Sequence, residues 1–129
     1  MNKTENTILV VDDEQTMCTI LRRILEKAEY NVLTACNGEK AIEIVKKSPP
    51  DVILLDLMIP GMNGREICRA VRELAPETKI IYFSAKVEFD QQKDKTIREE
   101  ADMFIKKPAS SRKILTGITS VLTNSVAFH

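Results

Sequence analysis

Short apolar runs and amphipathic segments alternate along the whole chain. The apolar runs reach only four or five residues, and the segments between them carry apolar side chains at the spacing of one helical face. Short, continuously apolar runs are typical of strands buried on both faces of a parallel sheet. We expect strands at 8–12, 31–36, 51–56, 79–84 and 103–107. We expect helices at 14–28, 38–47, 65–74, 89–100 and from Ser110 or Ser111 to 122.

This order of elements predicts one α/β domain with a doubly wound, five-stranded parallel sheet. Strands that alternate with helices place helices on both faces of the sheet through right-handed crossovers. A chain of 129 residues suits a single domain of this size. In such sheets the ligand site lies beyond the carboxyl ends of the strands. The predicted helix at 89–100 is very polar and has few apolar anchors.

Polar residues stand where four of the predicted strands end. Asp12 and Asp13 close the first strand, Asp56 the third, Ser84 the fourth and Lys107 the fifth. Three carboxylates in one crevice repel one another, so a counter-charge is required, and Mg²⁺ prefers such oxygen ligands. A metal ion, an ammonium and a hydroxyl would together stabilise a phosphoryl group arriving on a carboxylate. The pattern therefore points to an aspartyl phosphate.

Composition and charge exclude several other classes of protein. Nineteen basic and nineteen acidic residues cancel, and a chain without a basic stripe is a poor candidate for direct nucleic-acid binding. The apolar runs are too short to span a membrane, and residues 1–6 lack the apolar core of a signal peptide. A cytoplasmic protein without membrane association is expected.

The three cysteines are widely spaced and form no C-x-x-C motif. Cys18, Cys36 and Cys68 each lie beside apolar residues in a predicted helix or strand. This arrangement argues against a metal site or a disulfide framework. We expect all three to be small core side chains in a reducing compartment.

Four ordered segments resemble the receiver domain of two-component response regulators. They are ILVVDDE at 8–14, DVILLDLMIPGMNG at 51–64, FSA at 83–85 and ADMFIKKP at 101–108. The resemblance extends over nearly the whole chain. It implies a flavodoxin-like fold with strand order 2-1-3-4-5 and a receiver domain at 7–123. Residues 1–6 would be a tail, and 124–129 a tail or a linker remnant.

The resemblance also implies a role for each acidic residue. Asp56 would be the phosphoacceptor. Asp12, Asp13 and Asp56, with the backbone carbonyl of Met58, would bind Mg²⁺, and Mn²⁺ is a possible substitute. Such a domain is not an enzyme beyond its own aspartyl phosphorylation and dephosphorylation.

The remaining site residues follow from the fourth and fifth strands. By resemblance, Ser84 and Lys107 would hold the phosphoryl oxygens, and Ser84 with Phe104 would form the switch. The family's lysine directly precedes a proline, usually through a cis peptide bond. Neighbouring strand residues point to opposite faces, so only one of Lys106 and Lys107 can enter the site, and Lys107 is expected.

The chain departs from the family pattern at three positions. Many members have glycine where Glu100 stands, at the end of the preceding helix, and an aromatic residue where Ala109 follows the proline. Gly117 interrupts the last helix at a cost of about 1 kcal/mol relative to alanine. The geometry before the fifth strand therefore cannot be carried over from the family.

The expected function is a signalling domain that is switched by phosphorylation. The phosphoryl group would come from a sensor histidine kinase or a histidine phosphotransfer protein. The switch would alter the face formed by the fourth helix, fifth strand and last helix, through which a homodimer is possible. With only 124–129 beyond the last helix, no output domain is expected in this chain. It could act alone or be cut from a longer regulator or hybrid kinase.

Two alternatives remain open. One is an Asp-nucleophile phosphatase or phosphotransferase, but haloacid-dehalogenase-like enzymes carry a second Asp where Met58 stands here. The other is a receiver-like binding module that is never phosphorylated, against which the intact acidic pair argues. The only histidine, His129, ends the chain, which excludes an internal Ser-His-Asp triad.

Overall fold

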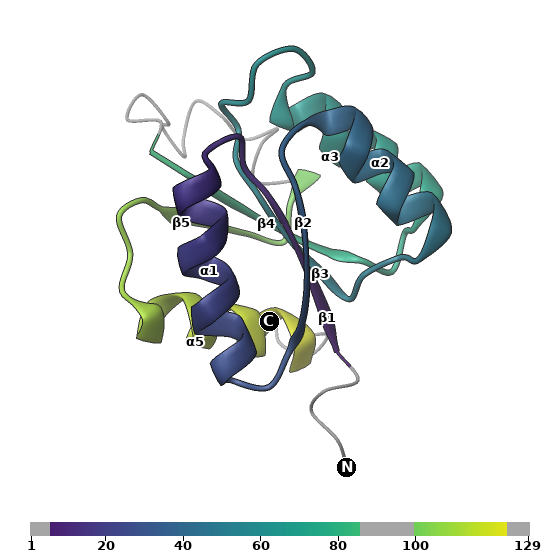
Figure 1. Cartoon of the computed structure of the whole chain (residues 1–129). Helices are drawn as coiled ribbons and strands as arrows, with labels where there is room; N and C mark the ends of the chain where they lie inside the picture. Colours follow the sequence, from purple (N-terminus) through teal and green to yellow (C-terminus); the bar gives the residue numbers. More distant parts are fainter. Residues whose placement is uncertain (1–5, 86–99, 124–129) are drawn as a thin grey trace.

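The structure is a computed structural model that describes residues 6–85 and 100–123. Within these residues the strands and helices follow one another in the predicted order, and Figure 1 shows their arrangement. The elements are β1 (Thr7–Val11), α1 (Gln15–Lys27), β2 (Asn31–Ala35), α2 (Gly38–Lys47), β3 (Val52–Leu55), α3 (Gly64–Leu74), β4 (Lys79–Ser84), β5 (Met103–Lys106) and α5 (Ser111–Thr123). The predicted helix at 89–100 and the predicted tails fall almost entirely outside the described residues.

The strands form one parallel sheet in the order β2-β1-β3-β4-β5, which confirms the predicted fold class. Val11 of β1 pairs with Ala35 of β2 on one side and with Leu55 of β3 on the other. Leu55 in turn pairs with Tyr82 of β4. The carboxyl ends of the strands therefore meet at one edge of the sheet, as the site prediction requires.

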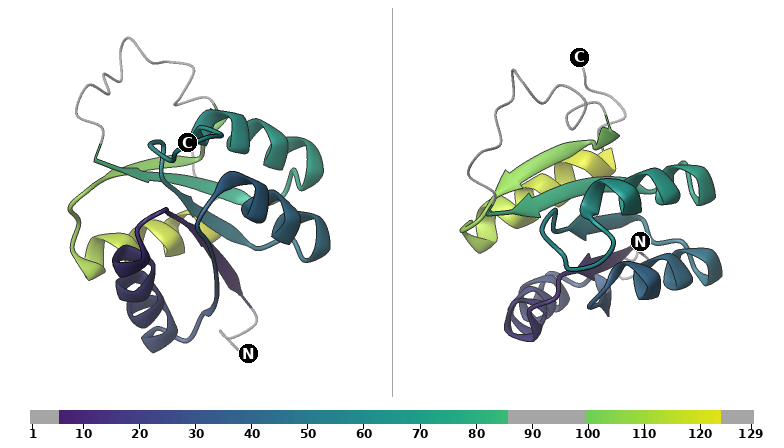
Figure 2. Two further views of the ribbon diagram at one scale, coloured as in Figure 1. Left: turned by 45° about the horizontal axis from the view of Figure 1, so that its top comes forward. Right: turned by 90° about the horizontal axis from the view of Figure 1, so that it is seen from above.

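Helices cover both faces of the sheet, α1 and α5 on one side and α2 and α3 on the other (Figures 1 and 2). Because strand neighbours point to opposite faces, Val10 belongs to the core under α1 and α5, and Val11 to the core under α2 and α3. Each layer therefore has its own apolar core, and the strands are buried on both sides.

Local capping defines where several helices begin. The side chain of Asn37 accepts a hydrogen bond of 2.8 Å from the Lys40 amide at the start of α2. At the start of α3, Asn63 and Glu66 form a capping box, each side chain bonding the other's backbone amide. Ser110 caps α5 by accepting from the Lys113 amide. The α3 cap closes the loop that follows β3.

Gly117 allows α5 to lie close against β5. A Cβ atom at this position would lie 2.8 Å from Ile105 Cδ1 and 3.1 Å from Met103 Sδ. Glycine has a low helix propensity, but at this position it lets the helix pack closely on the sheet.

One predicted core position is wrong. Cys36 is exposed, because it follows the last residue of the edge strand β2, whereas Cys18 and Cys68 are buried as predicted. Ile20 is 46% exposed, because the side of α1 that faces the sheet is set by Leu21 and Leu25. No helix among the described residues is long and apolar enough to cross a bilayer.

Candidate functional site

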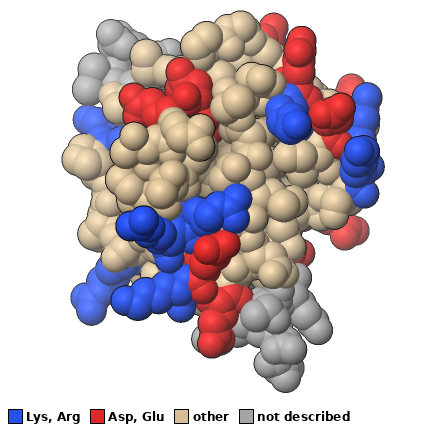
Figure 3. Space-filling model, viewed as in Figure 1, with Lys and Arg blue, Asp and Glu red and all other residues tan. Residues whose placement is uncertain are grey.

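Three carboxylates converge at the carboxyl edge of the sheet. Asp12, Asp13 and Asp56 offer oxygens that all lie within 4.8 Å of one another. The Asp56 amide donates to the Val11 carbonyl at 3.1 Å, which places Asp56 directly beside the end of β1. Asp12 and Asp56 are only 2% and 8% exposed, whereas Asp13 is exposed, so the cluster is open to solvent on one side. Figure 3 shows a group of acidic side chains beyond the start of α1, whereas basic and acidic side chains lie side by side over its second half.

Lys107 supplies the positive charge of this cluster. Its Nζ lies 2.7 Å from Asp12 Oδ2 and 3.1 Å from Asp56 Oδ2, and 5.3 Å from the centre of the Phe83 ring. Lys106 is exposed, so it is Lys107 that the structure places in the site. The Lys107–Pro108 peptide bond is cis.

The acidic neighbours keep Lys107 charged. Burial alone would lower the pKa of the Lys107 ammonium. Hydrogen bonds to Asp12 and Asp56, together with their negative charges, outweigh burial, so the pKa lies above its ordinary value. The ammonium therefore offsets part of the repulsion among the carboxylates.

Asp56 is held in one orientation by hydrogen bonds to both of its oxygens. Ser84, fully buried at the end of β4, donates from Oγ to Asp56 Oδ1 at 3.0 Å. The Met58 amide donates to the same oxygen at 2.9 Å, while the Met58 side chain is exposed. Oδ2 faces Lys107. Ser84 therefore points at Asp56 already in this structure.

Phe104 lies outside the acidic cluster, on the strand next to the one that ends at Ser84. It pairs with Tyr82 in the β4–β5 register, two positions before the pair of Ser84 with Lys106. Residues two positions apart on a strand point to the same face. Its side chain is partly buried and packs against the core under α2 and α3. The two predicted switch residues thus occupy the same face of neighbouring strands.

The cluster suits a hard divalent cation. The side-chain atoms that this cluster offers as metal ligands are all carboxylate oxygens. A bound ion would complete its coordination with water on the side that is open to solvent. Mg²⁺ and Mn²⁺ fit this set of ligands, whereas Zn²⁺ favours nitrogen and sulfur ligands. The predicted acidic residues are therefore brought together in an arrangement that fits the predicted metal.

Comparison with known proteins identifies the family. The family model described as "Response regulator receiver domain" matches residues 8–119. The chain belongs to this family. Receiver domains are signalling domains that bind Mg²⁺ at an acidic pocket, and in this chain the structure brings Asp12, Asp13 and Asp56 together in one acidic group.

Individual relatives agree with this assignment. The chain is 37% identical over 127 residues to the alkaline phosphatase synthesis transcriptional regulatory protein PhoP of Bacillus subtilis, covering 97% of this chain and 50% of that protein. It thus spans about half the length of this curated relative.

Solved structures show the same fold. Chemotaxis protein CheY4 of Vibrio cholerae has a TM-score of 0.83 and 28% identity, covering 91% of this chain and 98% of that one. A CheY-like receiver domain protein from Methanospirillum hungatei JF-1 has a TM-score of 0.82 and 25% identity, covering 91% and 93%.

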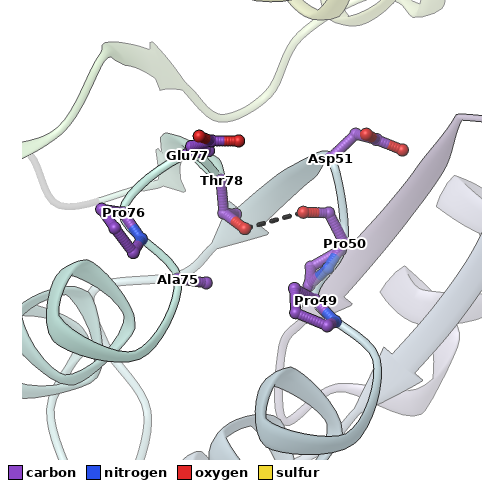
Figure 4. Close-up of a pocket in the computed structure, with 7 residues that line it drawn as sticks. All are labelled: Pro49, Pro50, Asp51, Ala75, Pro76, Glu77 and Thr78. Carbon is purple, nitrogen blue, oxygen red and sulfur yellow. Dashed lines mark hydrogen bonds between the residues drawn. The ribbon is translucent and has the colours of Figure 1, made fainter.

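A pocket at the opposite edge of the sheet is separate from the acidic site. It has a volume of about 370 Å³ and lies between the loops that precede β3 and β4 (Figure 4). Its residues are Pro49, Pro50, Asp51, Ala75, Pro76, Glu77 and Thr78. Thr78 Oγ1 donates to the Pro50 carbonyl at 2.7 Å and joins the two loops. The pocket therefore belongs to the packing of the amino-terminal edge.

Sequence reasoning missed one group of interacting residues. In the sequence Glu100 stands out only as a departure from the family's glycine, yet its carboxylate contacts Arg65 and Arg69 of α3. The arginines at 65, 69 and 72 recur at helical spacing, which was the available signal. Their partner could not be foreseen, because it is about thirty residues away in the chain.

Proposed function

We propose that Asp56 accepts a phosphoryl group from a phosphohistidine and that the chain is a signalling domain switched by this event. The donor would be a sensor histidine kinase or a histidine phosphotransfer protein. One observation carries the proposal: Asp56 is oriented by Ser84 and Lys107, with Asp12 and Asp13 beside it. A carboxylate held in this way is prepared to act as a nucleophile.

The chemical step would be a direct transfer to Asp56. A carboxylate oxygen of Asp56 would form a bond to phosphorus while the phosphorus–nitrogen bond of the phosphohistidine breaks. The electron pair of the broken bond would stay on the imidazole nitrogen. Lys107 and Ser84 would donate to the phosphoryl oxygens, because both already contact Asp56. A bound Mg²⁺, held by Asp12, Asp13, Asp56 and the Met58 carbonyl, would neutralise negative charge on the transferred group.

The switch would follow from the added charge. A phosphoryl group brings about −1.5 to −2 charges and three acceptor oxygens to the site. Ser84 would exchange its hydrogen bond to Asp56 Oδ1 for one to a phosphoryl oxygen, and Phe104 would turn into the space that is vacated. The shift can be no larger than the difference in contacts between the two states.

The output would be a change in protein contacts on the face that includes β5 and α5. A partner or a second copy of the chain would recognise this face in one state more than in the other. One relative is a transcriptional regulatory protein twice as long as the matched region. We therefore propose that output is exerted either by partners or by a further domain of a longer protein.

Phosphorylation can be tested by intact-mass spectrometry after incubation with acetyl phosphate and Mg²⁺. One acid-labile phosphate is expected in the wild type and none in Asp56→Asn. Asp51→Asn is a matched control, because Asp51 precedes the same strand at its opposite end and should still be labelled. Labelling of Asp56→Asn, or equal labelling in excess EDTA, would contradict the proposal.

The switch can be tested by NMR with beryllofluoride, which mimics the phosphoryl group. Large shifts are expected at Ser84 and Phe104 in the wild type and smaller ones in Ser84→Ala. Shifts limited to the acidic cluster in both proteins would argue against the switch but not against phosphorylation.

A further inference from the structure

The two ends of the edge strand β5 are held by different sets of contacts. At its carboxyl end, the Lys107 amide donates to the Ser84 carbonyl at 2.9 Å, and the Lys107 ammonium contacts Asp12 and Asp56. All of these partners belong to the acidic site. Any change of charge at Asp56 therefore acts directly on this end of β5.

Before the amino end of β5, the Glu100 side chain is bound by α3. Arg65 donates to both carboxylate oxygens, from Nε at 3.2 Å and from a terminal nitrogen at 3.4 Å. Arg69 adds a contact of 3.5 Å. The Glu100 side chain is only 16% exposed, and the hydroxyl of the buried Tyr82 of β4 lies 3.5 Å from it. A largely buried, bidentate pair of this kind is stronger than a surface ion pair.

The backbone at this point is bound as well. The Glu100 carbonyl accepts two hydrogen bonds from Arg72, at 3.1 and 2.9 Å, and one from the Cys68 thiol at 3.3 Å. Asp102 accepts from Arg72 and from the Ile80 amide, and its own amide donates to the Ile80 carbonyl at 2.8 Å. These contacts join α3 and β4 to the start of β5, and none of them involves a residue of the acidic site.

We propose that Glu100 is a positioning residue that anchors the start of β5 to α3, so that the rearrangement driven by the phosphoryl group is confined to 104–107. The inference rests on the function proposed above. Glycine, common at this position in the family, has no carboxylate to make the contacts with Arg65 and Arg69. The anchor is thus a property of this chain rather than of the family pattern.

The first test measures the anchor without any ligand. Amide hydrogen exchange is compared in the wild type, in Glu100→Gln and in the control Glu26→Gln, which removes charge from the exposed pair with Arg22 on α1. In Glu100→Gln the Asp102 amide should exchange at least about tenfold faster, because losing a largely buried charged partner loosens the segment. Glu26→Gln should match the wild type. Unchanged exchange in Glu100→Gln would overturn the anchor.

The second test adds beryllofluoride and Mg²⁺ and maps the amide shifts along β5 and α3. In the wild type, shifts should be large at 104–107 and small at 101–103 and 65–72. In Glu100→Gln they should spread to 101–103 and 65–72, with the same beryllofluoride midpoint. Confined shifts in both proteins, or spread shifts in both, would overturn the positioning role. Failure of the wild type to bind beryllofluoride would instead overturn the proposed function. The anchor would then still be tested by the amide hydrogen exchange of Glu100→Gln, which needs no ligand.

Discussion

Lys107 and Asp12 form an ion pair of 2.7 Å although the strands that they directly follow, β5 and β1, are separated in the sheet by β3 and β4. The long lysine side chain therefore reaches across the carboxyl ends of two strands. Along the chain the two residues are 95 positions apart. The pair links the edge strand to the middle of the sheet and neutralises part of the acidic cluster at the same time.

Removing this ammonium should lower stability. In Lys107→Ala the free energy of unfolding in EDTA should fall by about 3 kcal/mol, because Asp12 and Asp56 are left buried without a counter-charge. Lys106→Ala is the matched control, since the neighbouring lysine is exposed, and it should change stability by less than about 0.5 kcal/mol. Urea denaturation measures the free energy of unfolding of both variants. Equal losses in the two variants would contradict the conclusion that Lys107, and not Lys106, neutralises the acidic cluster.

Mg²⁺ should stabilise the folded chain. A ligand that binds only the folded state adds about 1.4 kcal/mol at ten times its dissociation constant, so the thermal midpoint should rise with MgCl₂. Asp13→Asn should reduce this rise because it removes one of the clustered carboxylates. Glu43→Gln, on the exposed side of α2, should show the full rise. A rise of the same size in Asp13→Asn would place the ion elsewhere.

Gly64 should not tolerate a side chain. A Cβ atom there would lie 2.8 Å from the Asp56 carbonyl oxygen and 2.8 Å from Leu57 Cα, and backbone atoms cannot move aside cheaply. Gly64→Ala should lose about 1–3 kcal/mol of stability and slow labelling of Asp56 by acetyl phosphate. Gly117→Ala is the control, because its nearest atom is the tip of the Ile105 side chain, and labelling should persist.

The three cysteines should differ in reactivity. In the native protein iodoacetamide should modify Cys36, which is exposed, and leave Cys18 and Cys68 unmodified. Burial raises the pKa of both buried thiols, so the reactive thiolate is disfavoured there. Peptide mass spectrometry before and after unfolding in guanidinium measures this, and all three should react once unfolded. Native modification of Cys68 would contradict the packing described for α3.

The order and type of the described elements were predictable because the signals are local. Short apolar runs that end in a polar residue placed β1, β3 and β4 within a residue or so of where they lie. The same reasoning placed Asp12, Asp56 and Ser84 at one edge, since parallel strands share the direction of their carboxyl ends.

Tertiary structure decided what depends on partners far apart in the chain. Cys36 and Cys68 have equally apolar neighbours, yet only Cys68 is buried, because α3 turns it toward the sheet, whereas Cys36 lies past the end of an edge strand. The sequence shows Glu100 only as a departure from the family's glycine, and the tertiary structure shows that it binds Arg65 of α3. Periodicity reports which face of an element is apolar, but the contacts of a polar side chain depend on how elements pack, and short-range patterns do not contain that information.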